Sequence, residues 1–213
     1  MSELPESADP VETEAPQEAA APGRKRPKPG ERRVQILQTL ASMLEQPGAE
    51  RITTAALAAR LQVSEAALYR HFASKAQMFE GLIEFIESSV FTLLNQVAER
   101  EQAGQAQRMV QVLLQFGERN PGMTRVMVGD ALVFEHERLG LRMNQFFDRV
   151  ESLLRQSLRL SAEAAGSATP TVEANGQASA LTCFAIGRLQ RFARSGFRRL
   201  PTEQLDIALR ALG

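Results

Sequence analysis

Apolar residues recur at helical spacing in the first half of the chain and divide it into three short segments and one long one. The first segment starts at Glu31 and is interrupted by Pro47 and Gly48, and its apolar positions share one helical face: Val34, Leu37, Leu40, Ala41 and Leu44. Two shorter helices are predicted over residues 55–61 and 65–72, after hydroxyl side chains that can cap them: Thr53, Thr54 and Ser64. Three short helices with tight connections have the size of a helix-turn-helix headpiece.

A long helix is predicted after Ser74, because Ser74 and Gln77 have the spacing of a capping box. Its apolar surface is wide enough to contact both the headpiece and another body of helices. A helix over residues 108–118, closed by Asn120-Pro121-Gly122, is followed by one or two short helices over 123–134. Further helices are predicted over 135–160, 172–197 and 202–212, with a small-residue loop at 161–171. No segment reads convincingly as a strand, so the sequence predicts an all-α fold of about nine helices.

The net charge of the whole chain hides a basic excess in the residues that follow the first 23. The 213-residue chain has a formal net charge of zero, but residues 1–23 contain six of the 25 acidic side chains and no Lys or Arg. The remaining residues therefore have 25 basic and 19 acidic side chains, a net charge of +6, which suits a nucleic-acid partner. No apolar run is long enough for a membrane span, and the acidic start does not fit a secretory signal, so a cytoplasmic protein is expected.

Residues 1–30 carry six of the ten prolines and few bulky apolar side chains, so we expect a disordered tail. The tail is acidic first and then basic, and Arg26 and Lys28 are candidates for contacts with DNA. The alternative is a solvated charge run without a partner. The acidic half could also shield the basic half from DNA.

The third short helix has the side chains of a recognition helix on its outward side. Serine, tyrosine and arginine can hydrogen-bond phosphates or base edges, and alanine permits close approach to thymine methyl groups. Threonines at the start of the second helix, and a lysine after the third, add sites for phosphate, although simple capping explains the threonines equally well. The DNA-binding candidates in the headpiece are Arg33, Thr53, Thr54, Ser64, Glu65, Ala66, Ala67, Tyr69, Arg70, His71 and Lys75.

The runs Arg51-Ile52-Thr53-Thr54, Ser64–Phe72 and Ser74-Lys75 resemble the headpiece of TetR-type regulators. Residues 82–87, 116–122 and 188–197 resemble the nucleoid occlusion members of that family, and the resemblance covers residues 31–212. It implies a tail over 1–30, a DNA-binding headpiece over 31–76 and a TetR-type helical dimerisation and partner-binding domain over 77–213. It also implies a nucleoid-associated homodimer that binds palindromic double-stranded DNA, with one or more dimers per site. When bound, such a protein antagonises polymerisation of the division protein FtsZ and blocks septum formation over the nucleoid.

The resemblance places the FtsZ-facing surface on the two helices after the headpiece, where the matching residues are Phe85, Arg119 and Asn120. Leu93 and Gln115 stand on that surface where a basic residue and a glycine are expected. Periodicity alone favours Phe85 as a core residue. Arg119 could equally contact a carbonyl at the end of its own helix.

A stripe of small and large apolar residues near the C-terminus suits close helix packing between two copies of the chain. The predicted dimer interface contains Leu181, Phe184, Ala185, Leu189, Phe192 and Leu205, with an intramolecular core as the alternative. Neighbouring arginines could rim that interface or bind a second anionic ligand: Arg188, Arg191, Arg194, Arg198 and Arg199. The only cysteine, Cys183, is expected to pack in the core.

The main competing function is a transcriptional repressor that a small-molecule ligand releases from DNA. An enzyme is the remote alternative, because the sequence shows no nucleophile with its base, no glycine-rich phosphate loop and no paired acid site. The two histidines lack companions at metal-ligand spacing, and His136, between Glu135 and Glu137, is expected on the surface. No cofactor or metal is expected.

Overall fold

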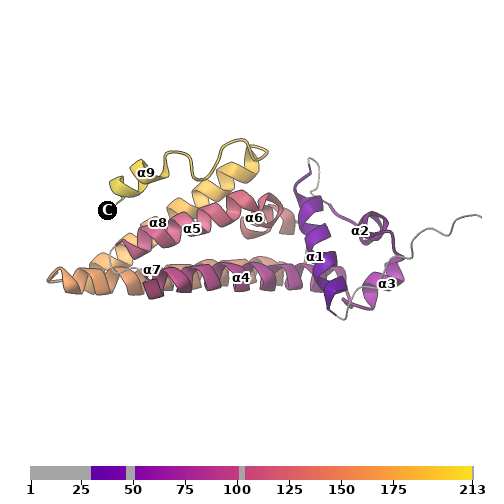
Figure 1. Ribbon diagram of the computed structural model, residues 1–213, viewed down its shortest axis with the longest axis horizontal. Coiled ribbons are helices and arrows are strands. Elements are labelled where there is room, and N and C mark those ends of the chain that lie inside the picture. Colours follow the sequence, from indigo (N-terminus) through magenta and orange to yellow (C-terminus); the bar gives the residue numbers. More distant parts are fainter. Residues whose placement is uncertain (1–29, 47–50, 101–103, 213) are drawn as a thin grey trace, which may run out of the picture.

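The computed structural model describes residues 30–46, 51–100 and 104–212, and within these ranges the chain is entirely helical, as predicted, with no strand (Figure 1). The described residues form nine α-helices and one 3-10 helix: α1 (Glu31–Leu44), α2 (Thr54–Leu61), α3 (Glu65–Tyr69), α4 (Lys75–Arg100), α5 (Gln105–Arg119), α6 (Pro121–Met127), η1 (Asp130–Leu132), α7 (Glu137–Ala164), α8 (Pro170–Arg194) and α9 (Leu205–Ala211).

Helices α1, α2 and α3 form a small group at one end of an elongated molecule (Figure 1). Their contact surface is apolar, with Leu40, Leu57 and Leu68 almost completely buried, while Ala58 on α2 allows close packing. The bounds of α1 agree with the periodicity. Four of the five residues on the predicted apolar face are buried, whereas Val34, in the first turn, is 47% exposed.

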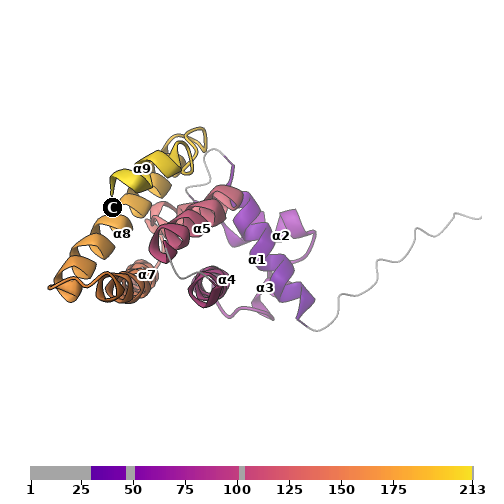
Figure 2. The ribbon, with the colours of Figure 1, turned by 60° about the vertical axis from the view of Figure 1, so that its left-hand side comes forward.

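Helix α4 leaves this group and runs along the body of the molecule. Figure 2 shows α4 between α7 and α1, with α5 above it, which agrees with the packing of α4 against all three helices. Helix α7 packs most extensively against α8. Phe91 on α4 meets Phe146 on α7 edge to face, with ring centroids 5.5 Å apart, so an aromatic contact closes the core between these two long helices.

A close contact between α1 and α6 joins the three-helix group to the body. Gly122 on α6 lies so close to the backbone of Ala41 that an added Cβ would overlap the Ala41 carbonyl. The Arg125 guanidinium donates a hydrogen bond of 3.3 Å to the carbonyl oxygen of Leu44, at the end of α1, where carbonyl groups lack partners within the helix. Glycine is therefore required at residue 122 for close approach of the two backbones.

Helices α6 and α8 both begin earlier than the sequence suggests, and in both the reason is proline. Pro121 and Pro170 each occupy the first turn of a helix, α6 and α8, where the missing N–H group has no cost. The run Asn120-Pro121-Gly122 therefore both ends α5 and begins α6. Helix α7 begins at Glu137 and continues to Ala164, so the first four residues of the predicted loop at 161–171 are helical instead, and the ion pair Arg159–Glu163 supports these last turns.

None of the helices in the described part of the chain is long and apolar enough to cross a membrane.

Candidate nucleic-acid interface

The turn between α2 and α3 is fixed by local hydrogen bonds. Thr53 accepts a hydrogen bond of 3.1 Å from the Ala56 N–H, and Ser64 accepts one of 3.3 Å from the Ala67 N–H, so both residues cap their helices as predicted. Between them Gln62 adopts a left-handed conformation with φ 56°, and the Val63 N–H bonds back to Ala58. This geometry ends α2 sharply and turns the chain directly into α3.

Helix α3 presents a polar surface with small side chains to solvent. Leu68 and Phe72 are buried beneath it, Ala67 is half-buried, and the remaining candidates are exposed: Ser64, Glu65, Ala66, Tyr69, Arg70 and His71. The helix itself ends at Tyr69, so Arg70 and His71 belong to the following turn. This exposure agrees with the sequence prediction and leaves the side chains free to reach a groove.

A hydrogen-bonded network links α3 to the start of α2. The Thr54 hydroxyl donates to the Glu65 carboxylate at 2.6 Å, and the Tyr69 hydroxyl lies 3.5 Å from the Thr54 oxygen. The carboxylate therefore sits near the N-terminus of α2, where the helix dipole favours a negative charge. Sequence reasoning assigned that position to a DNA phosphate and did not anticipate that Glu65 reaches it.

Arg33 ties α1 to the turn after α3. Its guanidinium donates a hydrogen bond of 3.1 Å to the His71 carbonyl oxygen and stacks over the Phe72 ring, 4.2 Å from the centroid. A guanidinium has five N–H donors, so this exposed side chain can still meet a phosphate.

Lys75 lies in the first turn of α4, next to the end of α3. Ser74 accepts a hydrogen bond from the Gln77 N–H, and the Gln77 side chain accepts one from the Ala73 N–H, so the predicted capping box is present with its return bond shifted by one residue. The Lys75 ammonium forms an ion pair with Glu135, with 2.5 Å between Nζ and Oε1. The sequence did not predict this pair. The candidates Arg26 and Lys28 lie outside the described residues.

The residues expected to face a protein partner lie on α4 and at the end of α5. Phe85 is 43% exposed, which excludes the core position that periodicity favours. Arg119 is exposed, and its side chain forms no hydrogen bond or ion pair among the described residues, so the alternative of a carbonyl contact is not observed. The Asn120 amide is half-buried and donates to the Phe116 carbonyl oxygen at 2.7 Å, so it is used to end α5.

The predicted dimer interface needs correction. Five of its six residues are buried within the chain itself: Leu181, Ala185, Leu189 and Phe192 on α8, which packs against α5, α6 and α7, and Leu205 on α9. Only Phe184 is partly exposed, beneath the guanidinium of Arg188. The intramolecular alternative therefore holds for those five.

The opposite side of α8 is open and lined by small residues. Gly176, Ala180 and Cys183 are exposed and Gly187 is half-buried, and their spacing of three and four residues places them on one helical face. Because Cys183 is exposed on this face, the prediction that it packs in the core is wrong. The sequence prediction of the interface was based on the larger apolar residues of this helix. Periodicity alone does not show whether these residues or the small residues on the opposite side face the rest of the chain. We call these four residues the small-residue face of α8.

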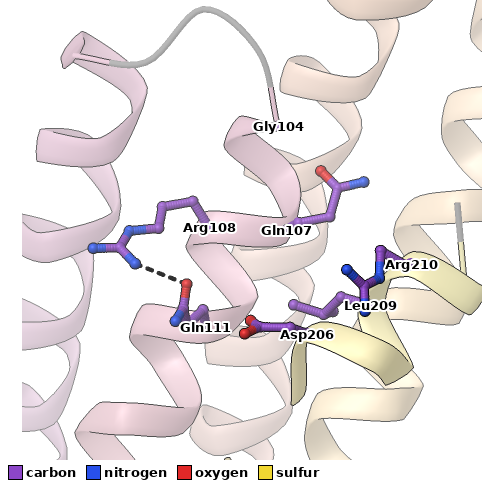
Figure 3. Close-up of a pocket in the computed structure, with 7 residues that line it drawn as sticks. All are labelled: Gly104, Gln107, Arg108, Gln111, Asp206, Leu209 and Arg210. Carbon is purple, nitrogen blue, oxygen red and sulfur yellow. Dashed lines mark hydrogen bonds between the residues drawn. The ribbon is translucent and has the colours of Figure 1, made fainter. Parts of the chain in front are cut away.

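A pocket of about 400 Å³ opens between α5 and α9 (Figure 3). The figure shows Asp206 and Arg210 on α9 facing Gln111 and Gln107 on α5, and Arg108 donating to Gln111. A smaller pocket of about 230 Å³ lies between α4 and α7, beside Phe91 and Arg149. Both pockets are open to solvent, whereas small-molecule sites are usually more enclosed.

Comparisons with known proteins agree with this arrangement. The family model described as "Bacterial regulatory proteins, tetR family" matches residues 36–82, and the SlmA-like model described as "Tetracyclin repressor-like, C-terminal domain" matches residues 100–212. Among solved structures, the fatty acid degradation regulator FadR from Bacillus halodurans has a TM-score of 0.70 at 11% identity, over 86% of this chain and 95% of that one. The ketosteroid regulator KstR2 of Mycobacterium tuberculosis has a TM-score of 0.65 at 17% identity, over 86% and 93%. At such low identity these structures show a shared fold alone.

Curated relatives are much more similar in sequence. The nucleoid occlusion factor SlmA of Idiomarina loihiensis is 52% identical over 177 residues, which cover 82% of this chain and 90% of the relative. The SlmA of Vibrio cholerae is 52% identical over 178 residues, with the same shares of each chain. On this similarity, and on the match over residues 100–212, the chain belongs to the SlmA nucleoid occlusion factors within the TetR family of bacterial regulatory proteins.

Proposed function

We propose that this protein binds palindromic sites on the chromosome as a homodimer and, when bound, antagonises FtsZ polymerisation, so that no septum forms over the nucleoid. The observation that carries the proposal is the placement of two separate exposed surfaces on one chain. One is the polar outer side of α3, and the other contains two exposed side chains, Phe85 on α4 and Arg119 at the end of α5.

Residues 31–76 are the DNA-binding headpiece in this proposal. Capping by Thr53 and Ser64 holds α3 at a fixed angle to α2, so its exposed side can enter a major groove. Arg70 is the candidate for a guanine edge or a phosphate, whereas Arg33, Tyr69 and Lys75 are candidates for phosphate contacts.

Residues 77–213 carry dimerisation and partner binding. The small-residue face of α8 is the candidate dimer interface, because small side chains let two helices approach closely. A two-fold dimer would place its recognition helices in successive major grooves, about 34 Å apart, and therefore requires a palindromic site. Arg119 is the candidate for an acidic segment of FtsZ, because a free guanidinium pairs well with carboxylates.

The competing function is a repressor that a ligand releases from DNA. The 52% identity to SlmA relatives over most of the chain favours nucleoid occlusion over that alternative.

Two experiments test the proposal. Chromosome-wide binding in cells should find palindromes at many positions, and enrichment at a few promoters only would favour a repressor. Purified protein on such a palindrome should reduce FtsZ sedimentation with GTP, and Arg119→Asp should abolish that effect while DNA affinity is kept. Arg199→Asp, in the segment between α8 and α9, is the matched control and should behave as wild type, because the Arg199 side chain is exposed and forms no hydrogen bond or ion pair among the described residues. Unchanged FtsZ antagonism by Arg119→Asp would remove this surface from the proposal.

A further inference from the structure

Three ion pairs connect α4 to the segment that contains the start of α7. Lys75 pairs with Glu135 at 2.5 Å, Glu80 with Arg138 at 2.8 Å and Glu87 with Arg142 at 2.8 Å. Hydrogen bonding to Glu87 raises the pKa of Arg142. The negative charges of Glu84 and Glu80 add to this rise, whereas partial burial of Arg142 opposes it. In the last two pairs the cation belongs to α7, whereas in the first it belongs to α4. Only the first pair therefore places a carboxylate on a lysine next to the recognition helix.

The Lys75–Glu135 pair is also the least exposed of the three. The Glu135 side chain is 9% exposed and that of Lys75 is 28% exposed, while the ammonium lies 5.7 Å from the centroid of the Phe79 ring. A carboxylate so well shielded from water depends on its cationic partner, because an unpaired charge at such a site is strongly unfavourable.

The position of Lys75 makes it attractive for a second anion. It lies in the first turn of a 26-residue helix, where backbone N–H groups without helical partners and the helix dipole favour a negative charge. A backbone phosphate of DNA carries one negative charge, as Glu135 does. A phosphate that approaches α4 beside α3 therefore meets a lysine that a carboxylate already neutralises.

We propose that Glu135 is a built-in competitor for DNA phosphate at Lys75, and that DNA binding transfers Lys75 from Glu135 to the phosphate. The transfer releases the segment before α7 from the start of α4. That segment also contains Val133 and Phe134, which are 71% and 67% exposed, so an apolar surface of the body becomes free to move when DNA binds. The inference rests on the proposed DNA contact of Lys75.

Affinity for DNA tests the competition directly. The full chain is titrated at low salt against a labelled mixed-sequence duplex, because phosphate contacts do not depend on sequence. Glu135→Gln should bind about 3- to 10-fold more tightly, the range expected for one partly shielded charged contact. Glu137→Gln removes the same charge two residues away, at an exposed position, and should change affinity less than about twofold. Thermal unfolding confirms that each variant is folded.

The double variant separates this idea from a general effect of charge. Lys75→Gln should weaken binding, and Glu135→Gln should then give no gain in the Lys75→Gln background. A gain that persists without Lys75, or weaker binding by Glu135→Gln alone, overturns the proposal. If Lys75→Gln leaves affinity unchanged, both the phosphate contact and the competition fail, while DNA binding by the rest of the headpiece stands.

Hydrogen exchange distinguishes the competition from a purely structural role for Glu135, because a purely structural role predicts no response of this segment to DNA. Addition of DNA should speed exchange of backbone amides in residues 133–139 of the wild type. In Glu135→Gln the same amides should exchange fast already, with little further response to DNA. Identical protection with and without DNA in the wild type would contradict the release.

Discussion

The contact between α1 and α6 predicts that Gly122→Ala destabilises the protein, although alanine is the better helix former. In the first turn of α6 the helix propensity of alanine contributes at most about 1 kcal/mol of stability. Against this, the new methyl group overlaps the Ala41 carbonyl of α1, and backbone atoms of a helix cannot rotate away. Helix α6 has to move, at an overpacking cost of about 1–3 kcal/mol, and the hydrogen bond from Arg125 to Leu44 adds about 1 kcal/mol when it is lost. We expect a net loss of about 1–3 kcal/mol in the free energy of unfolding.

Gly140→Ala is the matched control for this prediction. Gly140 lies within α7, and an added Cβ there meets no atom within 4 Å, so the same substitution should stabilise by about 0.5–1 kcal/mol. Urea unfolding followed by far-UV circular dichroism measures both variants, at one protomer concentration because dimerisation changes apparent stability. The reasoning is refuted if Gly122→Ala is as stable as the wild type, or if the two variants shift in the same direction.

Three further predictions follow from buried contacts and exposed surfaces. Thr124→Val should lose about 1 kcal/mol in the same urea assay, because the buried Thr124 hydroxyl donates a hydrogen bond of 2.8 Å to the Gly117 carbonyl oxygen. Ala180→Glu should shift the protein from dimer to monomer in analytical ultracentrifugation while the helical spectrum is kept, and an unchanged dimer would exclude the small-residue face of α8 as the interface. Thr53→Ala should cost about 1 kcal/mol through the lost cap of α2 and should also weaken DNA binding in an anisotropy titration; normal affinity would leave Thr53 with the capping role alone.

The elements of the headpiece could be predicted because their signals are local. Helix periodicity gave the bounds of α1, and caps such as Thr53 and Ser64 act within three residues of their own position. The same holds for the exposed side of α3, which follows once Leu68 and Phe72 are assigned to the core. Chemistry set by neighbouring residues is therefore readable from the sequence.

Contacts between distant segments could not be predicted in this way. Glu135 is 60 residues from Lys75, and nothing in the local pattern distinguishes it from Glu137, which is exposed. On α8 the large apolar residues and the small-residue face have the same period, so the sequence alone does not show which side meets the rest of the chain. Tertiary packing decides both cases.

The headpiece is attached to the body by two contacts of different kinds, the backbone contact between α1 and α6 and the ion pair between Lys75 and Glu135. This difference suggests a route by which DNA activates the partner-facing surface. The contact between Gly122 and Ala41 is made by backbone atoms, which no phosphate can replace, whereas the pair between Lys75 and Glu135 can be exchanged. Release of Lys75 would remove one of the three ion pairs between α4 and the start of α7 and so allow a small shift of α4 about the α1–α6 contact. Phe85 is on α4, while Arg119 ends α5, two residues before α6 begins at Pro121. The relation between Phe85 and Arg119 then depends on whether Lys75 is held by Glu135. Glu135→Gln should accordingly antagonise FtsZ sedimentation without DNA more strongly than the wild type or Glu137→Gln, and an equal dependence on DNA in all three proteins would show that activation takes another route.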